Sequence, residues 1–387
     1  MNLEDKITIA QHRIEELYHE TEGRCYVSFS GGKDSTVLLA LVKMCEELYT
    51  IPQNAIPAVY ANTGIEMGVT IEFVKWVKDN WYPNVIVIRP EKSFDWVVKN
   101  RGKPLKSKIK SKDLRQYLFG QRTDKITRLM TDGRTGGDDE SGRLSLKHKI
   151  ADKDMHMMHD DFQIVPSYKC CDYMKKKPFE KYAKEFGMRG NAQGVRTGEG
   201  GARDSAANVR VSKGGKLCTW VKHGIIQKAP IIDWSEKYVD EFVDLYNVPL
   251  SDAYTKYGFD RTGCMGCPYA KHIDKQLEYL YFHEPNRYKA SMHWLKDVYI
   301  AQNVFLPFDE EYEAERSYIW RTRYEPMRQE MLRNYRPNSR LIKDSEQLSM
   351  FEILENEGRY AQGCEQNLVI SDRNDQIEGN DEQIKNI

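Results

Sequence analysis

The spacing of apolar residues predicts strands that alternate with helices in the N-terminal part of the chain. Short runs rich in β-branched and aromatic residues predict buried strands at residues 25–29, 56–61 and 84–89. Longer apolar segments predict helices at residues 7–18, 36–44 and 69–81. Because strands that alternate with helices over short links build parallel sheets, we expect an α/β fold with a doubly wound parallel sheet.

The C-terminal part of the chain has a different pattern. Residues 294–335 are rich in aromatic and charged residues with helical spacing, and they predict a helical cap on the sheet. From residue 336 the chain turns polar and acidic, which predicts a disordered tail. We therefore expect three parts. Residues 1–270 form a sheet-bearing domain with a basic insertion at about 99–165, residues 271–335 form a helical extension, and residues 336–387 form a tail.

A glycine-rich turn joins the first predicted strand to the next helix, with the sequence Ser-Gly-Gly-Lys-Asp-Ser at residues 30–35. Two glycines let the backbone approach a ligand, and the amides at a helix start, at the positive end of its dipole, bind phosphate groups. Lys33 adds a cation, and Asp34 and Ser35 either cap the helix or lie near a bound Mg²⁺. Residues 62–64 follow the second predicted strand and reach the same edge of the sheet. These features predict a nucleotide site; the alternative is a glycine turn without a ligand.

Eight cysteines are present, and the chain has neither the N-terminal pattern of a signal peptide nor an apolar run that could span a membrane. This predicts a cytoplasmic protein whose cysteines serve metal or redox chemistry rather than disulfides. Four of them form two close pairs: Cys170 with Cys171, and Cys264 with Cys267. Soft thiolates select zinc or an iron–sulfur cluster, and the spacing alone does not separate these two. Buried cysteines without a ligand are the alternative.

The overall charge is balanced, with 58 basic and 58 acidic residues, but one segment is strongly basic. Between residues 99 and 128 there are eleven lysines and arginines against two aspartates. Such a segment favours either a phosphate-rich partner such as nucleic acid or a solvated basic surface, and both interpretations stay open.

The glycine-rich turn resembles the PP-loop of the ATP pyrophosphatase superfamily. These proteins bind an adenine nucleotide on a Rossmann-like sheet, the adenine nucleotide alpha hydrolase-like fold, and typically split ATP between its α and β phosphates. Together with Cys-Cys and Cys-x-x-Cys, the turn resembles the phosphoadenylyl-sulfate and adenylyl-sulfate reductase family. In its cluster-bearing branch, the resemblance implies that the four paired cysteines, Cys170, Cys171, Cys264 and Cys267, ligate a [4Fe–4S] cluster, with zinc as the alternative.

Two further segments carry the same resemblance. Asn-Thr-Gly at residues 62–64 resembles the D-T-G element of the family, with Asn62 in place of Asp. Residues 194–203 resemble its G-x-R-x-x-E-S-x-x-R element, with Gly200 in place of Ser and one extra residue before the second arginine. The resemblance implies a nucleotide site made of Ser30, Gly31, Gly32, Lys33, Asp34, Ser35, Thr63, Gly64, Arg196 and Arg203.

The resemblance breaks at the C-terminus. Reductases of the family carry a nucleophilic cysteine in an E-C-G-[LI]-H motif, whereas Cys364 here has neither the glycine nor the histidine after it. The same scaffold occurs in the sulfur-transfer component of DNA phosphorothioation systems. The basic segment favours that branch, as does Gln-Leu-Ser-Met-Phe at residues 347–351, which resembles the peptide that docks on the DNA sliding clamp.

We therefore expect an ATP-using enzyme, with Mg²⁺, that transfers sulfur to nucleic acid, DNA above all. Lys33 and Asp34 are the predicted catalytic residues, and a cysteine desulfurase is a candidate sulfur donor. One alternative is a sulfonucleotide reductase that releases sulfite. The other is a regulator that binds nucleotide and DNA without turnover.

Overall fold

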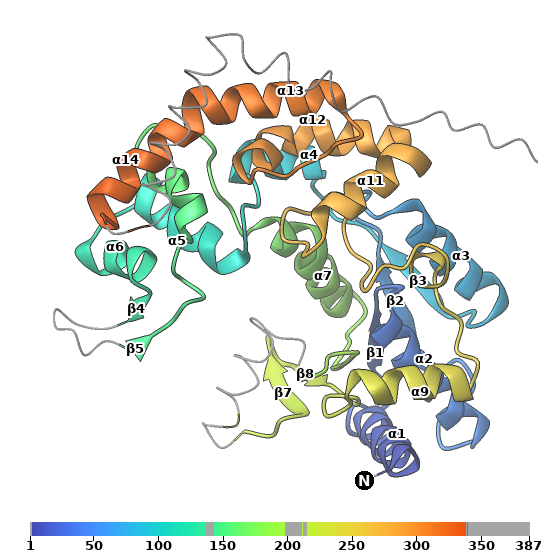
Figure 1. Cartoon of the computed structure of the whole chain (residues 1–387). Helices are drawn as coiled ribbons and strands as arrows, with labels where there is room; N and C mark the ends of the chain where they lie inside the picture. Colours follow the sequence, from blue (N-terminus) through green and yellow to red (C-terminus); the bar gives the residue numbers. More distant parts are fainter. Residues whose placement is uncertain (1, 136–142, 198–210, 212–214, 338, 340–387) are drawn as a thin grey trace, which may run out of the picture.

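A six-stranded sheet forms the centre of the N-terminal part of the protein (Figure 1). The structure is a computed structural model and describes residues 2–135, 143–197, 211, 215–337 and 339. The strands lie in the order β3-β2-β1-β6-β8-β7, and all neighbours pair in parallel except β7, which is antiparallel to β8. Their bounds are β1 (Cys25–Phe29), β2 (Ala58–Ala61), β3 (Val85–Ile88), β6 (Gly190–Gln193), β7 (Thr219–Lys222) and β8 (Ile225–Lys228). The predicted doubly wound α/β fold is confirmed.

Helices cover both faces of this sheet (Figure 1). One face packs on the helices α1 (Leu3–Glu20), α2 (Lys33–Glu47), α3 (Gly68–Asn80) and α9 (Glu236–Leu245). The other packs on α7 (Lys177–Glu185). The side chains of β1 alternate between the two buried faces of the sheet. Val27 belongs to the core on the α1 and α2 face, and Tyr26 belongs to the small cluster on the α7 face. The strand order reverses between β1 and β6, and ligands of such folds bind at this point, beyond the carboxyl ends of the strands.

A second hydrophobic core lies outside the sheet. It joins the segment after β3 to the C-terminal helices, and Figure 1 shows these elements together on one side of the sheet. Its elements are α4 (Phe94–Arg101), α5 (Lys108–Phe119), α6 (Asp124–Thr131), the 3-10 helix η1 (Asp152–Met158), α11 (Ile273–His283), α12 (Pro285–Ala301), α13 (Glu310–Ile319), the π-helical turn η3 (Trp320–Tyr324) and α14 (Glu325–Tyr335). No strand residue belongs to this core among the described residues. The prediction that residues 294–335 cap the sheet is therefore wrong, because their apolar faces are buried against α4–α6 and η1.

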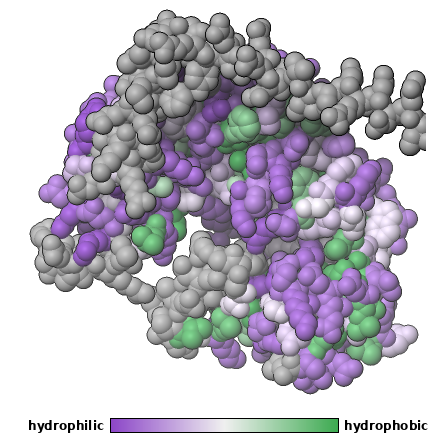
Figure 2. Space-filling view, viewed as in Figure 1, coloured by the Kyte–Doolittle hydropathy of each residue, from purple (hydrophilic) through white to green (hydrophobic). Residues whose placement is uncertain are grey.

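The described chain also contains the hairpin of β4 (Arg134–Thr135) and β5 (Arg143–Leu144), and the short helix α10 (Asp252–Thr255). Within the described ranges, no helix is long and apolar enough to cross a membrane. The face of the molecule seen in Figure 2 is largely hydrophilic. The predicted tail lies outside the described residues from residue 340 onward, and so do Cys364 and residues 347–351.

Candidate functional site

The glycine-rich turn leads directly from β1 into α2. Gly31 has φ +71°, a left-handed conformation that favours glycine, and Gly32 precedes the helix with extended backbone and no side-chain cap. The turn is held by its own serines, because the hydroxyls of Ser30 and Ser35 lie 3.0 Å apart. It is also held from outside, since the Lys33 N–H donates to the Tyr254 hydroxyl at 3.0 Å. The turn therefore presents a helix start, without a side-chain cap, to the carboxyl edge of the sheet.

A cleft of about 1560 Å³ opens over this turn. The predicted residues Ser30, Gly32, Lys33, Asp34, Ser35 and Arg196 all line it. The loop after β6 reaches it because Gly194 packs on the start of α2: a Cβ there would lie 2.7 Å from the Asp34 carbonyl oxygen. Arg196 Nε then donates to Asp34 Oδ1 at 2.7 Å, and its guanidinium also contacts Glu236.

Four of the predicted nucleotide residues do not line the cleft or are not described. Gly31 belongs to the turn but is not among the residues that line the cleft. Thr63 and Gly64 follow β2 and do not line the cleft. Thr63 is buried, and its N–H donates to the Glu66 carboxylate at 3.0 Å, so its contacts hold the loop after β2. Arg203 lies outside the described residues.

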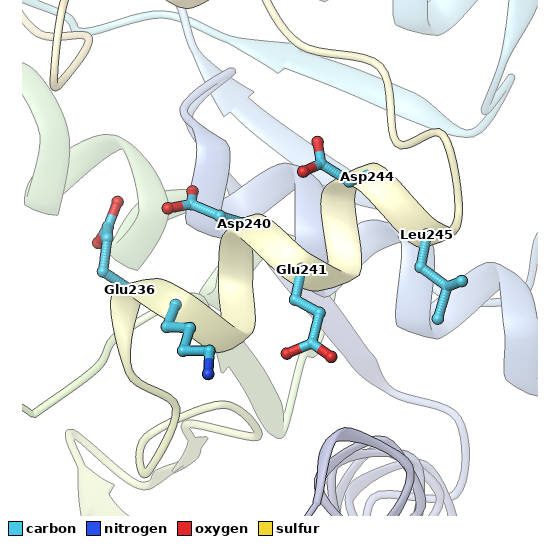
Figure 3. A pocket seen from close by; sticks show the side chains of 6 residues that line it. Glu236, Asp240, Glu241, Asp244 and Leu245 are labelled. Carbon is cyan, nitrogen blue, oxygen red and sulfur yellow. The ribbon is translucent and has the colours of Figure 1, made fainter.

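An acidic row on α9 faces the turn, and sequence reasoning missed it. Figure 3 shows Glu236, Asp240 and Asp244 on one side of α9, with Glu241 and Leu245 on the other. All three acids line the cleft. Lys33 contacts Glu236, and its Nζ lies 2.7 Å from Asp240 Oδ1. The only sequence signal was the regular spacing of these three acids along a helix.

These contacts set the charge state of Lys33. Partial burial alone would lower the pKa of its ammonium, but hydrogen bonds to Asp240 and Glu236 outweigh burial and raise it. Lys33 therefore stays protonated, with its ammonium held by these two carboxylates.

The four paired cysteines come together beside the cleft. Cys170 and Cys171 directly precede the π-helical turn η2 (Asp172–Lys176), and their Sγ atoms are 4.0 Å apart. The second pair is held against the loop after β2, because Cys264 forms a β-bridge with Glu66. The hydrogen bond with Cys171, burial, and the nearby thiols of Cys267 and Cys264 together raise the pKa of Cys170. All four thiols are thus close enough to interact.

The donor set has the chemistry of a thiolate metal site, since it contains sulfur ligands from two segments and no carboxylate or imidazole. In the part of the chain that the structure describes, however, no group of three or more His, Cys, Asp or Glu side chains is arranged as a metal-binding set. The residue types fit zinc or a cluster, while the closed ligand geometry is not formed.

Lys175 connects the cysteines to the cleft and was also missed. The electrostatic interaction with Cys264 in its thiolate form raises the pKa of the Lys175 ammonium despite burial, with further contributions from Glu66 and Cys171. Lys175 lines the large cleft and also a chamber of about 110 Å³ that includes Ser30 and Glu66. Its position four residues after Cys171, one helical turn, was the available signal.

The predicted basic segment uses much of its charge internally. Lys103 Nζ lies 2.8 Å from Asp297, Lys106 Nζ lies 2.7 Å from Asp154, and Arg122 pairs with Asp160. Lys99 pairs with Asp95, and Arg115 donates to two backbone carbonyls. Because these contacts hold the second core together, the segment offers less charge to a phosphate-rich partner than its composition suggests. Nucleic-acid binding stays a prediction.

Comparison with known proteins places these features in a family. The protein family described as "Phosphoadenosine phosphosulfate reductase domain" matches residues 24–131 and 141–270, which make up more than half of the chain. An uncharacterised protein of Methanocaldococcus jannaschii is 24% identical over 266 residues, which cover 66% of this chain and 45% of that protein. The chain thus spans less than half the length of this curated relative.

Solved structures show more distant likenesses. A phosphoadenylyl-sulfate reductase from Candida auris, in a phosphate complex, has a TM-score of 0.35 at 14% identity, over 62% of this chain and 81% of that chain. A Candida glabrata FMN adenylyltransferase has a TM-score of 0.37 at 13% identity, over 68% of this chain and 63% of that chain. The U34-tRNA thiolase of Methanococcus maripaludis, with its [4Fe-4S] cluster, has a TM-score of 0.34 at 13% identity, over 76% of this chain and 80% of that chain.

Likenesses this distant carry no argument about function. The family match covers the turn, the loop after β6 and both cysteine pairs, and so confirms the resemblance seen in the sequence. The protein therefore belongs to the phosphoadenosine phosphosulfate reductase domain family, which supports an enzyme of nucleotide-dependent, sulfur-related chemistry.

Proposed function

We propose that the protein uses ATP to activate an acceptor and then transfers sulfur to it, with nucleic acid, DNA first, as the acceptor. One observation carries this proposal: Lys175 lines the nucleotide cleft and at the same time interacts with Cys264, Cys171 and Cys267. A single cation therefore connects the site for phosphate with the site for sulfur.

ATP would bind with its phosphates on the turn. The amides of the α2 start and the Lys33 ammonium would hold them, as helix starts hold anions. The acidic row of α9 would repel a bare triphosphate, so we expect Mg²⁺ to enter with it. Asp34, Glu236 and Asp240 are the carboxylates nearest Lys33 and Arg196, and they are candidate Mg²⁺ contacts. Mg²⁺ would offset the charge that develops on the leaving pyrophosphate.

Sulfur transfer would follow in two balanced steps. An acceptor oxygen attacks the α-phosphorus of ATP, the bond from that phosphorus to the bridging oxygen breaks, and pyrophosphate leaves. A sulfide then attacks the activated acceptor, the bond to the adenylated oxygen breaks, and AMP leaves. Sulfur delivered as sulfide requires no net electron transfer, whereas a persulfide donor, such as one loaded by a cysteine desulfurase, requires a thiol reductant.

The cysteine pairs would serve the second step. Cys170, Cys171, Cys264 and Cys267 would hold a [4Fe–4S] cluster, with zinc as the alternative. A bound cluster supplies a site that holds or polarises sulfur. The Lys175 ammonium would stabilise negative charge on the incoming sulfur where it meets the activated acceptor, an electrostatic role that needs no change in protonation.

The test is to purify the protein without oxygen, measure iron and sulfide, and supply ATP, Mg²⁺, radiolabelled sulfide and DNA. We expect pyrophosphate and AMP in equal amounts, with label in the DNA. Pyrophosphate release that ignores both DNA and RNA would overturn the nucleic-acid acceptor. Adenine nucleotide that binds tightly without turnover would instead favour the regulator.

The family match favours one second candidate, a reductase that releases sulfite from phosphoadenylyl sulfate or adenylyl sulfate. Both nucleotides should be offered to the cluster-loaded protein with a thiol reductant. Sulfite formed with turnover would establish this candidate in place of sulfur transfer.

A further inference from the structure

A second pocket lies beside the nucleotide cleft and has no role in the steps above. Its volume is about 280 Å³, and it shares Ser28, Gln193 and Lys176 with the cleft. This volume is slightly below the range of about 300–1000 Å³ for ligand pockets, so it suits one ring system better than a whole nucleotide. The pocket lies on the α7 face of the sheet, over β6 and β8.

Strand register builds the floor of this pocket. Tyr26 pairs with Asn191, Asn191 pairs with Gln227, and Gln227 pairs with Trp220. Residues in register on neighbouring strands point to the same face of a sheet, so these four side chains form one row across β1, β6, β8 and β7. The row places two amides between two aromatic residues.

The amides form a hydrogen-bonded network. Ser28 Oγ donates to Asn191 Oδ1 at 2.8 Å, and Asn191 Nδ2 donates to Gln227 Oε1 at 2.9 Å. Gln193 Nε2 donates to the same Gln227 oxygen at 2.7 Å. Gln227 Nε2 in turn donates to the Ile225 carbonyl oxygen at 3.3 Å, so Gln193 keeps more hydrogen-bonding capacity for a ligand than Gln227 does.

Such a network is unusual in the middle of a parallel sheet, where buried polar groups cost free energy unless they are satisfied. The apolar residues of the same face lie under α7, on β1, β2, β3 and at the start of β8. The polar part lies in the pocket, which Tyr26, Phe179 and Ile225 of the apolar cluster also line. A ligand that needs both an amide-lined floor and an aromatic wall explains this division of the face.

We propose that this pocket binds one nucleobase of the acceptor strand, an inference that rests on the proposed function. A base offers a flat ring to stack on Trp220 and a polar edge for the amide of Gln193, and stacking and edge hydrogen bonds are the two means by which proteins read an unstacked base. At the rim, Lys222 and His223 lie 3.6 Å and 3.7 Å from the Glu180 carboxylate, and Lys176 lines the entrance shared with the cleft. Basic residues there suit the phosphates that flank the base.

The same chemistry would recognise the adenine of ATP, so the test separates the two sources. A short single-stranded DNA with one 5-iodouracil is photocrosslinked to the full-length protein, with and without a nonhydrolysable ATP analogue, and the site is mapped by mass spectrometry. We expect a crosslink at Trp220 that the analogue does not remove. In a parallel reaction, 8-azido-ATP should label other residues. If 8-azido-ATP labels Trp220 and the analogue abolishes the DNA crosslink, the pocket belongs to ATP and the inference is wrong.

Variants give an independent measurement. Trp220→Ala should weaken binding of this DNA by roughly fivefold to 150-fold, the contribution of one stacked base, and leave ATP affinity unchanged. Trp220→Phe should restore most of the DNA affinity. Gln193→Leu should weaken DNA binding while the base still stacks on Trp220. Trp76, 44% exposed and stacked on Phe73 in α3, is the matched control: Trp76→Ala should change nothing.

The failures are distinguishable. If DNA binds Trp220→Ala as tightly as the native protein and no crosslink forms at Trp220, the strand follows another path, and only the pocket assignment falls. If neither DNA nor RNA of the same sequence binds the native protein, the nucleic-acid acceptor and the pocket assignment fall together.

Discussion

Arg196 Nε donates to Asp34 Oδ1 at 2.7 Å, which ties the loop after β6 to the first turn of α2. The Arg196 side chain is 8% exposed and also contacts Glu236. It therefore neutralises two carboxylates at the edge of the cleft where phosphate would bind. Burial alone would lower the pKa of Arg196, but Asp34 and Glu236 raise it, so the guanidinium stays charged.

Arg196→Ala should lower ATP affinity at least tenfold, because two carboxylates lose their cation and face the phosphates. It should also destabilise the fold by about 1–3 kcal/mol, less than the loss of a fully buried ion pair since Asp34 is partly exposed. Arg196→Lys keeps the charge but not the fork of donors and should recover part of both losses. Calorimetric titration with ATP and urea unfolding measure these effects. ATP affinity unchanged in Arg196→Ala would show that the phosphates bind elsewhere.

Gly194→Ala tests the packing that brings Arg196 into place. A Cβ at Gly194 would lie 2.7 Å from the Asp34 carbonyl oxygen and 2.9 Å from the Ser35 N, both backbone atoms that cannot move aside cheaply. We expect a loss of about 1–3 kcal/mol in the free energy of unfolding, together with weaker ATP binding. Gly263→Ala is the control for stability, because a Cβ there meets nothing within 4 Å. Equal stability of the two variants would contradict the close approach.

The strands and the glycine-rich turn could be predicted because their signals are local. The strand over residues 25–29 is found as predicted. Two other elements begin at residues that differ from the predicted ones, and each difference has a physical reason. Helix α1 begins earlier than its apolar pattern because Asn2 and Asp5 form a capping box. Strand β2 begins at Ala58 rather than residue 56, since Pro57 has no N–H to offer a neighbouring strand.

The partners of the predicted residues could not be read from the sequence. Lys33 meets Glu236 and Asp240 only because α9 folds back over α2, and Lys175 meets Glu66 only because the loop after β2 reaches the cysteines. Helical spacing likewise showed that the C-terminal helices bury an apolar face, but not which surface covers it. Periodicity reveals that a face is buried, whereas the identity of its partner is decided by contacts between distant segments.

Lys175→Gln should separate the two halves of the proposed reaction. The cation lies between the cleft and the cysteines, so its loss should leave pyrophosphate release within a fewfold of the native rate. Sulfur incorporation should fall by about 10²- to 10³-fold, the usual effect of removing one electrostatic contact to a developing charge. Iron content is measured alongside, since a loss of iron would explain the result differently. If Lys175→Gln reduces pyrophosphate release as strongly as sulfur transfer, Lys175 acts on the nucleotide alone.

Cys267→Ser tests the metal assignment directly. If the four paired cysteines hold a cluster, this variant should lose most of its iron and acid-labile sulfide when purified without oxygen, because a hydroxyl is a poor ligand for a soft site. Cys218→Ser is the matched control, because Cys218 is partly exposed on the segment before β7 and belongs to neither pair. Native protein that contains zinc without sulfide would overturn the cluster and leave a structural zinc site.

His156 should make the stability of the second core depend on pH. Its ring is fully buried among the aromatic rings of Trp320, Tyr324 and Phe162, with Nε2 2.8 Å from the Ala301 carbonyl oxygen. Burial lowers the pKa of His156 to about 4, from 6.5. The unfolded chain therefore takes up a proton below about pH 6.5, while the folded protein stays neutral at this residue until about pH 4. Because the unfolded state binds more protons in this window, stability is lost as pH falls through it.

The pKa of His156 differs by about 2.5 units between the unfolded and the folded protein. This difference corresponds to a total of about 3 kcal/mol in the free energy of unfolding, of which about 2 kcal/mol is lost between pH 7 and pH 5. His156→Gln removes the titration. It should be less stable than the native protein at pH 7, and the difference in unfolding free energy should shrink by about 2 kcal/mol at pH 5. His12→Gln, on an exposed side chain, should leave the pH dependence unchanged. If the difference in unfolding free energy between the native protein and His156→Gln stays constant from pH 7 to pH 5, His156 accepts its proton in the folded core.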